Sequence, residues 1–141
     1  MLEPIVLLVD DEAPFVDTMT KRLTKRKLTV FKSYSGEEAL ETLKENSHID
    51  LVILDVKMPG MNGIETLAEI KKSYPLVEVI MLSGHADVES AIDGMKQGAF
   101  DYLMKPCAVE DLLAKIEEAV LQVIDIVENN VYANKGANTW D

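Results

Sequence analysis

Apolar and polar residues follow two distinct patterns along this chain. Short runs of consecutive apolar residues, such as Ile5–Val9 and Leu51–Leu54, are typical of strands buried on both sides. Between these runs lie longer stretches with helical spacing, in which Phe15, Met19 and Leu23 are four positions apart. That spacing places the three side chains on one side of a helix. The sequence therefore predicts buried strands that alternate with amphipathic helices.

The alternation predicts five strands and five helices. We expect the strands at residues 5–9, 28–32, 51–54, 78–82 and 100–104, and the helices at residues 13–25, 36–46, 64–73, 88–97 and 109–127. Ser35 and Glu38 fit a capping box at the start of the second helix. Asp87 is a candidate N-cap of the fourth helix, and Gly98 suits a left-handed residue after it. Strict alternation predicts an α/β fold: a doubly wound, five-stranded parallel sheet covered by helices on both faces.

The end of the chain has a different character. Residues 128–141 lose the apolar periodicity and are rich in Asn and Gly. We therefore expect one domain at residues 1–127 and a mobile tail or linker at 128–141. Leu121, Ile124, Val127 and Val131 form an additional apolar row at helical spacing. This row could pair two subunits or lead into an output domain, which we favour, or it could pack on the domain's own core.

Composition narrows the class of protein. The 141 residues suit a single domain, and 48% hydrophobic with 28% charged residues is an ordinary globular mixture. Charges interrupt every apolar run, so we expect no membrane span. The first residues show neither a basic leader nor a small-residue cleavage site, so we expect a cytoplasmic protein that begins at or near Met1. Cys107 is the single cysteine, which excludes an internal disulfide and a cysteine-based zinc site. A net charge of −11 argues against direct binding of nucleic acid.

Five polar side chains follow the ends of four predicted strands. Asp10 and Asp11 follow the first strand, Asp55 the third, Ser83 the fourth and Lys105 the fifth. Ligands of open parallel sheets bind at the carboxyl ends of the strands, where these residues would meet. Three carboxylates at close range raise one another's pKa values or require a cation. Mg²⁺, or Mn²⁺ in its place, suits such oxygen ligands. The alternative, that Asp10 and Asp11 only cap a helix, leaves the matching positions of the other three unexplained.

The same positions carry the motifs of a known family. The pair Asp10-Asp11, the run LDVKMPGMNG at residues 54–63, Ser83-Gly84 and the run GAFDYLMKP at residues 98–106 resemble the receiver domain of two-component response regulators. The resemblance covers about residues 5–121. It implies a flavodoxin-like (βα)5 fold with strand order 2-1-3-4-5. It also implies a phosphorylation switch that catalyses only its own phosphorylation and dephosphorylation.

The resemblance assigns roles to individual residues. Asp55 would accept a phosphoryl group from a sensor histidine kinase and form an aspartyl phosphate. Asp10, Asp11 and Asp55 would hold Mg²⁺ together with the backbone carbonyl of Lys57. Lys105 would pair first with Asp55 and then with the phosphoryl oxygens.

Further roles concern the switch and its readout. Ser83 would donate its hydroxyl to the phosphate, Tyr102 would rotate inward, and the bond before Pro106 would be cis. Tyr102 has a simpler interpretation as an ordinary packing residue on a half-buried strand. The resemblance also implies that Lys57 and His85 occupy positions that tune aspartyl-phosphate lifetime in this family. The fourth helix, fifth strand and last helix would form a surface for homodimerisation, an effector or an attached output domain. The run at residues 98–106 resembles receivers attached to transcriptional regulators.

Three other functions fit the sequence less well. A haloacid-dehalogenase-like phosphatase also uses an Asp nucleophile with Mg²⁺, but it places a second acid where this chain has Lys57. A P-loop nucleotidase would need the motif G-x-x-x-x-G-K-[ST], which is absent from the sequence. A receiver-like interaction module without phosphorylation would not need the complete set of site residues.

Overall fold

The structure is a computed structural model that describes residues 3–84 and 88–139, with side chains described up to residue 129. Its strands are β1 (Ile5–Val9), β2 (Thr29–Ser33), β3 (Leu51–Leu54), β4 (Glu78–Ser83) and β5 (Asp101–Met104). Its helices are α1 (Ala13–Lys25), α2 (Gly36–Glu45), α3 (Gly63–Ser73), α4 (Val88–Lys96) and α5 (Val109–Thr139). Every predicted element is present, and each bound lies within one residue of its prediction except the end of α5. Asp87 and His85 lie outside the described residues.

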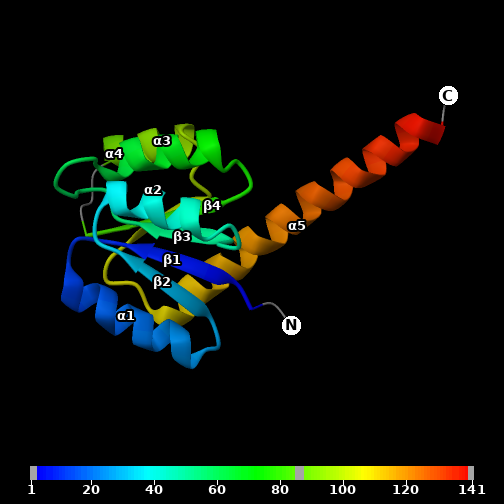
Figure 1. Cartoon of the computed structure of the whole chain (residues 1–141). Helices are drawn as coiled ribbons and strands as arrows, with labels where there is room; N and C mark the ends of the chain where they lie inside the picture. The colour runs from blue at the N-terminus through cyan, green and yellow to red at the C-terminus, as the bar shows by residue number, and fades with distance from the viewer. Residues whose placement is uncertain (1–2, 85–87, 140–141) are drawn as a thin grey trace.

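All five strands are parallel and lie in the order β2-β1-β3-β4-β5. This confirms the predicted doubly wound, flavodoxin-like sheet. Helices α1 and α5 cover one face, and α2, α3 and α4 cover the other (Figure 1). The central strands are therefore buried on both sides, which explains why they are apolar throughout.

Strand β1 shows how the two faces share one run of apolar residues. Val6 and Leu8 pack with the helices α1 and α5, whereas Leu7 and Val9 pack with α2 and α3. All four side chains are at most 1% exposed. Because neighbouring side chains of a strand point to opposite faces, both faces of the sheet require an apolar residue at every position.

Side-chain caps fix the starts of two helices at the site edge of the sheet. The Ser35 hydroxyl accepts a hydrogen bond from the Glu38 N–H, as predicted, but the Glu38 carboxylate accepts from the Tyr34 N–H instead of closing the box on Ser35. At the start of α3, Asn62 and Glu65 form a complete capping box. This capping box was not predicted from the sequence, in which Asn62 was noted only as part of the run at residues 54–63.

Helix α5 is longer than predicted. It runs from Val109 to Thr139, whereas the apolar periodicity of the sequence predicted its end at Val127. Its far part projects away from the sheet (Figure 1). Leu121, Ile124 and Val127 are 53%, 38% and 41% exposed, so this apolar row does not pack into the core of the domain. The division between domain and tail at residues 127 and 128 stays a prediction.

Among residues 3–84 and 88–139, none of the helices combines the length and the apolar character needed to cross a membrane.

Candidate functional site

The carboxyl ends of four adjacent strands bring the predicted site residues to one edge of the sheet. The backbone N–H of Asp55 donates to the carbonyl oxygen of Val9 at 3.0 Å, which places the end of β3 beside the end of β1. The N–H of Lys105 donates to the carbonyl oxygen of Ser83 at 2.9 Å, which places the end of β5 beside the end of β4. Asp10 follows β1 directly. Strand pairing alone therefore gathers residues that are far apart in sequence.

Three carboxylates converge at this edge. One oxygen each of Asp10, Asp11 and Asp55 lies within 4.8 Å of the others. Asp10 and Asp55 are 1% and 4% exposed, whereas Asp11 is exposed. Two buried acids and one exposed acid at this range form an oxygen-rich set that is open to solvent on one side. Such a set fits Mg²⁺, which binds carboxylates and retains several of its waters.

The environment of Asp55 gives its carboxyl group an unusual basicity. Burial raises the pKa of Asp55 above its ordinary value, and the nearby charge of Asp10 raises it further. The positive charge of Lys105, a hydrogen bond with the Ser83 side chain and the Val56 N–H at 2.8 Å act in the opposite direction. Burial and repulsion prevail, so the ionised Asp55 carboxylate is poorly stabilised by the protein alone. A bound cation would relieve this cost.

Lys105 lies beside the carboxylates in a well-defined position. Its ammonium Nζ lies 2.6 Å from Asp10 Oδ2 and 3.8 Å from Glu12 Oε1. It also lies 4.0 Å from the centre of the Phe15 ring, a cation–π contact. Lys105 thus forms ion pairs with Asp10 and Glu12. Its positive charge lies close enough to Asp55 to lower the pKa of that carboxyl group. In the sequence, Phe15 was recognisable only as part of the apolar side of a helix, and Glu12 was not predicted to take part in the site.

The loop after β3 is held against the backbone of Asp55. The N–H of Gly63 donates to the carbonyl oxygen of Val56 at 2.8 Å. A Cβ atom at Gly63 would overlap the carbonyl oxygen of Asp55, so no residue other than glycine fits without a shift of the backbone. Lys57 lies in this loop with an exposed side chain. Its backbone carbonyl as a metal ligand stays a prediction. The requirement at Gly63 was missed, because a tertiary contact of this kind leaves no local pattern.

The predicted switch residues lie beside the site. Ser83 is fully buried at the end of β4, where its side chain bonds with Asp55. Tyr102 is half-buried opposite Met81 in the sheet, and its ring packs close to Gly94 of α4. The bond between Lys105 and Pro106 is cis. The roles of Ser83 and Tyr102 in switching stay predictions.

Comparison with known sequences gives a consistent result. The family described as the response regulator receiver domain matches residues 6–117. The DNA-binding transcriptional regulator NtrC of Escherichia coli K12 is 35% identical over 120 residues, which are 85% of this chain and 25% of the relative. The transcriptional regulatory protein ZraR of the same organism is 37% identical over 115 residues, 82% of this chain and 26% of the relative. The chain spans about a quarter of the length of these curated relatives.

Solved structures agree with the sequence matches. A response regulator receiver domain protein from Clostridium thermocellum is 39% identical with a TM-score of 0.81, over 84% of this chain and 95% of that one. A CheY-like receiver domain protein from Methanospirillum hungatei is 31% identical with a TM-score of 0.82, over 88% and 98%. NtrX from Brucella abortus is 28% identical with a TM-score of 0.86, over 93% of this chain and 30% of that one. These matches do not support the phosphatase alternative.

Proposed function

Since this chain belongs to the response regulator receiver domain family of two-component signal transduction, we propose that Asp55 is its phosphoacceptor. The observation that carries the proposal is the convergence of three carboxylates, of Asp10, Asp11 and Asp55, beside the ammonium of Lys105. Phosphoryl transfer needs a nucleophile, a means of neutralising charge and accurate positioning. Each of these requirements corresponds to a described side chain.

The reaction is nucleophilic substitution at phosphorus. A carboxylate oxygen of Asp55 attacks the phosphorus of a phosphohistidine on a sensor histidine kinase. The bond between phosphorus and the imidazole nitrogen breaks, and its electron pair stays on the imidazole. The product is an aspartyl phosphate, a mixed anhydride that water can later hydrolyse at the phosphorus. The domain thus catalyses only its own phosphorylation and dephosphorylation.

The acidic residues would bind the metal ion, and Lys105 would balance the charge of the phosphoryl group. Asp10, Asp11, Asp55 and the backbone carbonyl of Lys57 would hold Mg²⁺, or Mn²⁺ as a substitute. When bound, the ion offsets the negative charge of the carboxylates and of the phosphoryl oxygens. The ammonium of Lys105 then moves from Asp10 to a phosphoryl oxygen, where charge has been added.

Phosphorylation is read out through the residues behind the site. The hydroxyl of Ser83, which bonds with Asp55 before phosphorylation, would donate to the new phosphoryl oxygens. Ser83 would thereby move toward the phosphoryl group, and this movement would make room for Tyr102 to turn inward beside Gly94 of α4. Because Tyr102 packs close to α4, its rotation would change the surface formed by α4, β5 and α5.

That surface carries apolar side chains that suit a protein partner. Val88, Ile92 and Met95 of α4 are 73%, 48% and 48% exposed, and Met104 of β5 is 41% exposed. We expect this face to bind a second copy of the chain or an effector after phosphorylation.

The wider setting follows from the relatives. NtrC is described as a DNA-binding transcriptional regulator, and this chain matches about a quarter of it. We expect the receiver to control an attached output domain or effector that acts on transcription in the cytoplasm. The net charge of −11 makes direct contact between the receiver and DNA unfavourable.

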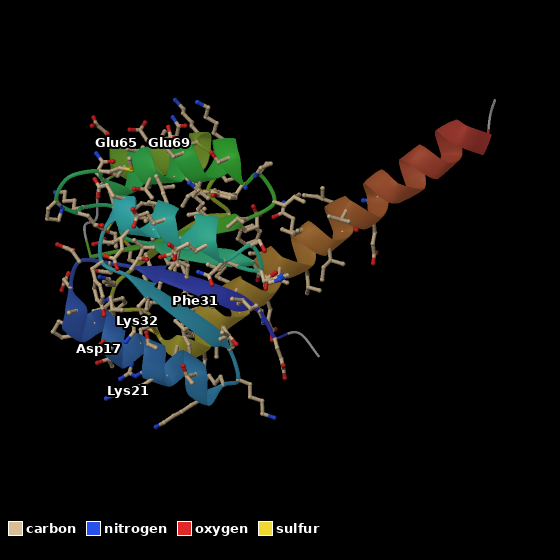
Figure 2. All side chains as sticks on the ribbon, in the orientation of Figure 1. Asp17, Lys21, Phe31, Lys32, Glu65 and Glu69 are labelled. Carbon is tan, nitrogen blue, oxygen red and sulfur yellow. The ribbon has the colours of Figure 1, made fainter. Side chains whose placement is uncertain are left out.

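The test is phosphorylation in solution. The chain is incubated with Mg²⁺ and a small acyl phosphate, and its intact mass is measured. We expect a gain of one phosphoryl group that is lost in Asp55→Asn and retained in Asp17→Asn, a matched change at an exposed aspartate of α1 (Figure 2). Failure of the wild-type chain to gain the group would contradict the proposal. Turnover of a generic phosphoester would instead favour the phosphatase alternative.

A further inference from the structure

A carboxylate outside the acidic site reaches across to the loop that follows β3. Glu37 lies in the first turn of α2, and its Oε1 accepts a hydrogen bond from the backbone N–H of Met61 at 2.8 Å, across 24 positions of sequence. Gly60 precedes Met61 with a φ of 75°, and a Cβ atom there would lie 3.0 Å from the same oxygen. The carboxylate of Glu37 therefore lies directly against the backbone of this turn.

Neighbouring contacts show that α2 and the turn fit closely together. A Cβ atom at Gly36 would overlap the Thr66 hydroxyl and would lie 3.1 Å from the carbonyl oxygen of Met61. The Thr66 hydroxyl donates to the carbonyl oxygen of Asn62 at 2.8 Å. The hydrogen bond from Met61 is the largest cause of a lowered pKa of Glu37, as expected for an ionised acceptor. The start of α2 thus holds Gly60 and Met61, in the part of the β3–α3 loop that lies nearer to α3.

The near part of the same loop is held at the acidic site. Gly63 bonds to the carbonyl oxygen of Val56 and lies against the carbonyl oxygen of Asp55. Lys57 lies between this anchor and the turn at Met61. The Lys57 peptide therefore lies between two anchors, one formed by the site itself and the other by Glu37.

We propose that Glu37 is a positioning residue for the metal-binding loop. Its hydrogen bond to Met61 holds the loop in the conformation that the proposed binding of metal by the Lys57 backbone carbonyl requires. Glu37 acts through the loop backbone and touches neither metal nor phosphoryl group. This inference rests on the proposed function, because it assumes that the three aspartates and Lys57 bind a divalent ion.

The experiment measures metal binding directly. Free Mn²⁺ is quantified by electron paramagnetic resonance during titration of the full chain and of four variants. Glu37→Ala removes the acceptor, and Glu37→Asp keeps the charge but shortens the reach. Glu37→Gln removes the charge but keeps an acceptor oxygen. Glu41→Ala is the matched control, because Glu41 is an exposed glutamate of α2 that forms no hydrogen bond or ion pair with the described residues.

The role of Glu37 predicts a distinct order of affinities. Glu37→Ala and Glu37→Asp should raise the Mn²⁺ dissociation constant on the order of tenfold, as loss of a supporting contact to a ligand does. Glu37→Gln and Glu41→Ala should stay within about twofold of wild type, since neither removes that contact. The midpoint of thermal unfolding without metal is recorded for every variant, so that a loss of folding is separated from a loss of binding.

Two results would overturn the inference. Unchanged Mn²⁺ affinity in folded Glu37→Ala would show that the loop does not depend on the bond. An equal loss in Glu37→Gln and Glu37→Ala would assign the effect to charge and not to the hydrogen bond. The proposed function is judged separately by acyl-phosphate labelling of wild type. Normal labelling with unchanged metal affinity in Glu37→Ala removes only the role of Glu37. Absent labelling and absent Mn²⁺ binding in wild type remove both.

Discussion

At the scale of single residues, the ionised carboxylate of Asp55 lowers the stability of the folded protein. Its carboxylate is buried, lies near Asp10 and has a raised pKa. The folded state therefore holds the proton of Asp55 more tightly than the unfolded chain does. Consequently, wild type loses stability as the pH rises from the ordinary aspartate pKa through the raised value, and the loss persists at neutral pH.

Asparagine at position 55 should stabilise the protein in the absence of metal. The side chain keeps an oxygen that can accept from the Val56 N–H, but it carries no charge for Asp10 to repel. We expect the free energy of unfolding of Asp55→Asn at pH 7 to exceed that of wild type by about 1 kcal/mol, as is common where a functional residue is held at a cost to stability. Urea unfolding in a chelator measures this difference, which should shrink as the pH falls to about 4. An asparagine variant less stable than wild type at pH 7 would contradict this account of Asp55.

At the scale of elements, the close contact between the start of α3 and the end of β3 fixes the site loop. Gly63→Ala should displace the loop, because its Cβ would overlap the carbonyl oxygen of Asp55. We expect a loss of about 1–3 kcal/mol in the free energy of unfolding, together with weaker binding of Mg²⁺. Urea unfolding and calorimetric titration measure the two effects.

Gly94→Ala is the matched control for this substitution. A Cβ atom at Gly94 would meet Met81 at 3.6 Å, an ordinary contact, and alanine is the better helix former in α4. We expect no loss of stability and unchanged Mg²⁺ affinity. Equal effects of the two substitutions would show that the close approach at Gly63 has no special importance.

The elements also show what the sequence could predict. Strands such as β3 were recognisable because burial on both faces makes every position apolar. The convergence of Asp10, Asp55 and Lys105 followed from their places after strands, since parallel strands end at one edge. The contact of Phe15 with Lys105 and the bond from Met61 to Glu37 join distant segments and leave no local pattern.

Two features of the helices were open to prediction but were not predicted. The capping box of Asn62 and Glu65 has the expected spacing, but the surrounding Pro and Gly residues favoured a turn. The length of α5 was underestimated, because Asn and Gly are weak helix formers and the apolar periodicity fades after Val127. Propensity is a weak guide where a preceding helix can simply continue.

At the scale of the whole molecule, the part of α5 that packs on the sheet should contribute more to stability than residues 128–139 of the same helix. Leu112, Ile116 and Ala119 of α5 are at most 1% exposed, whereas Leu121 and Val127 are largely exposed. Truncation after residue 127 should therefore change the free energy of unfolding by no more than about 0.5 kcal/mol. Urea unfolding of the truncated and full chains tests the division at residue 127. A larger loss would show that residues after Val127 belong to the folding unit.

The site edge of the sheet should direct a phosphoryl group to Asp55. The most direct measurement is to treat the chain with Mg²⁺ and a small acyl phosphate and then to reduce it with borohydride, which converts an aspartyl phosphate to homoserine. Tandem mass spectrometry then locates the modified residue. We predict homoserine at position 55, dependent on Mg²⁺. Homoserine at position 10 or 11, or at no position, would contradict the assignment of Asp55 as the phosphoacceptor.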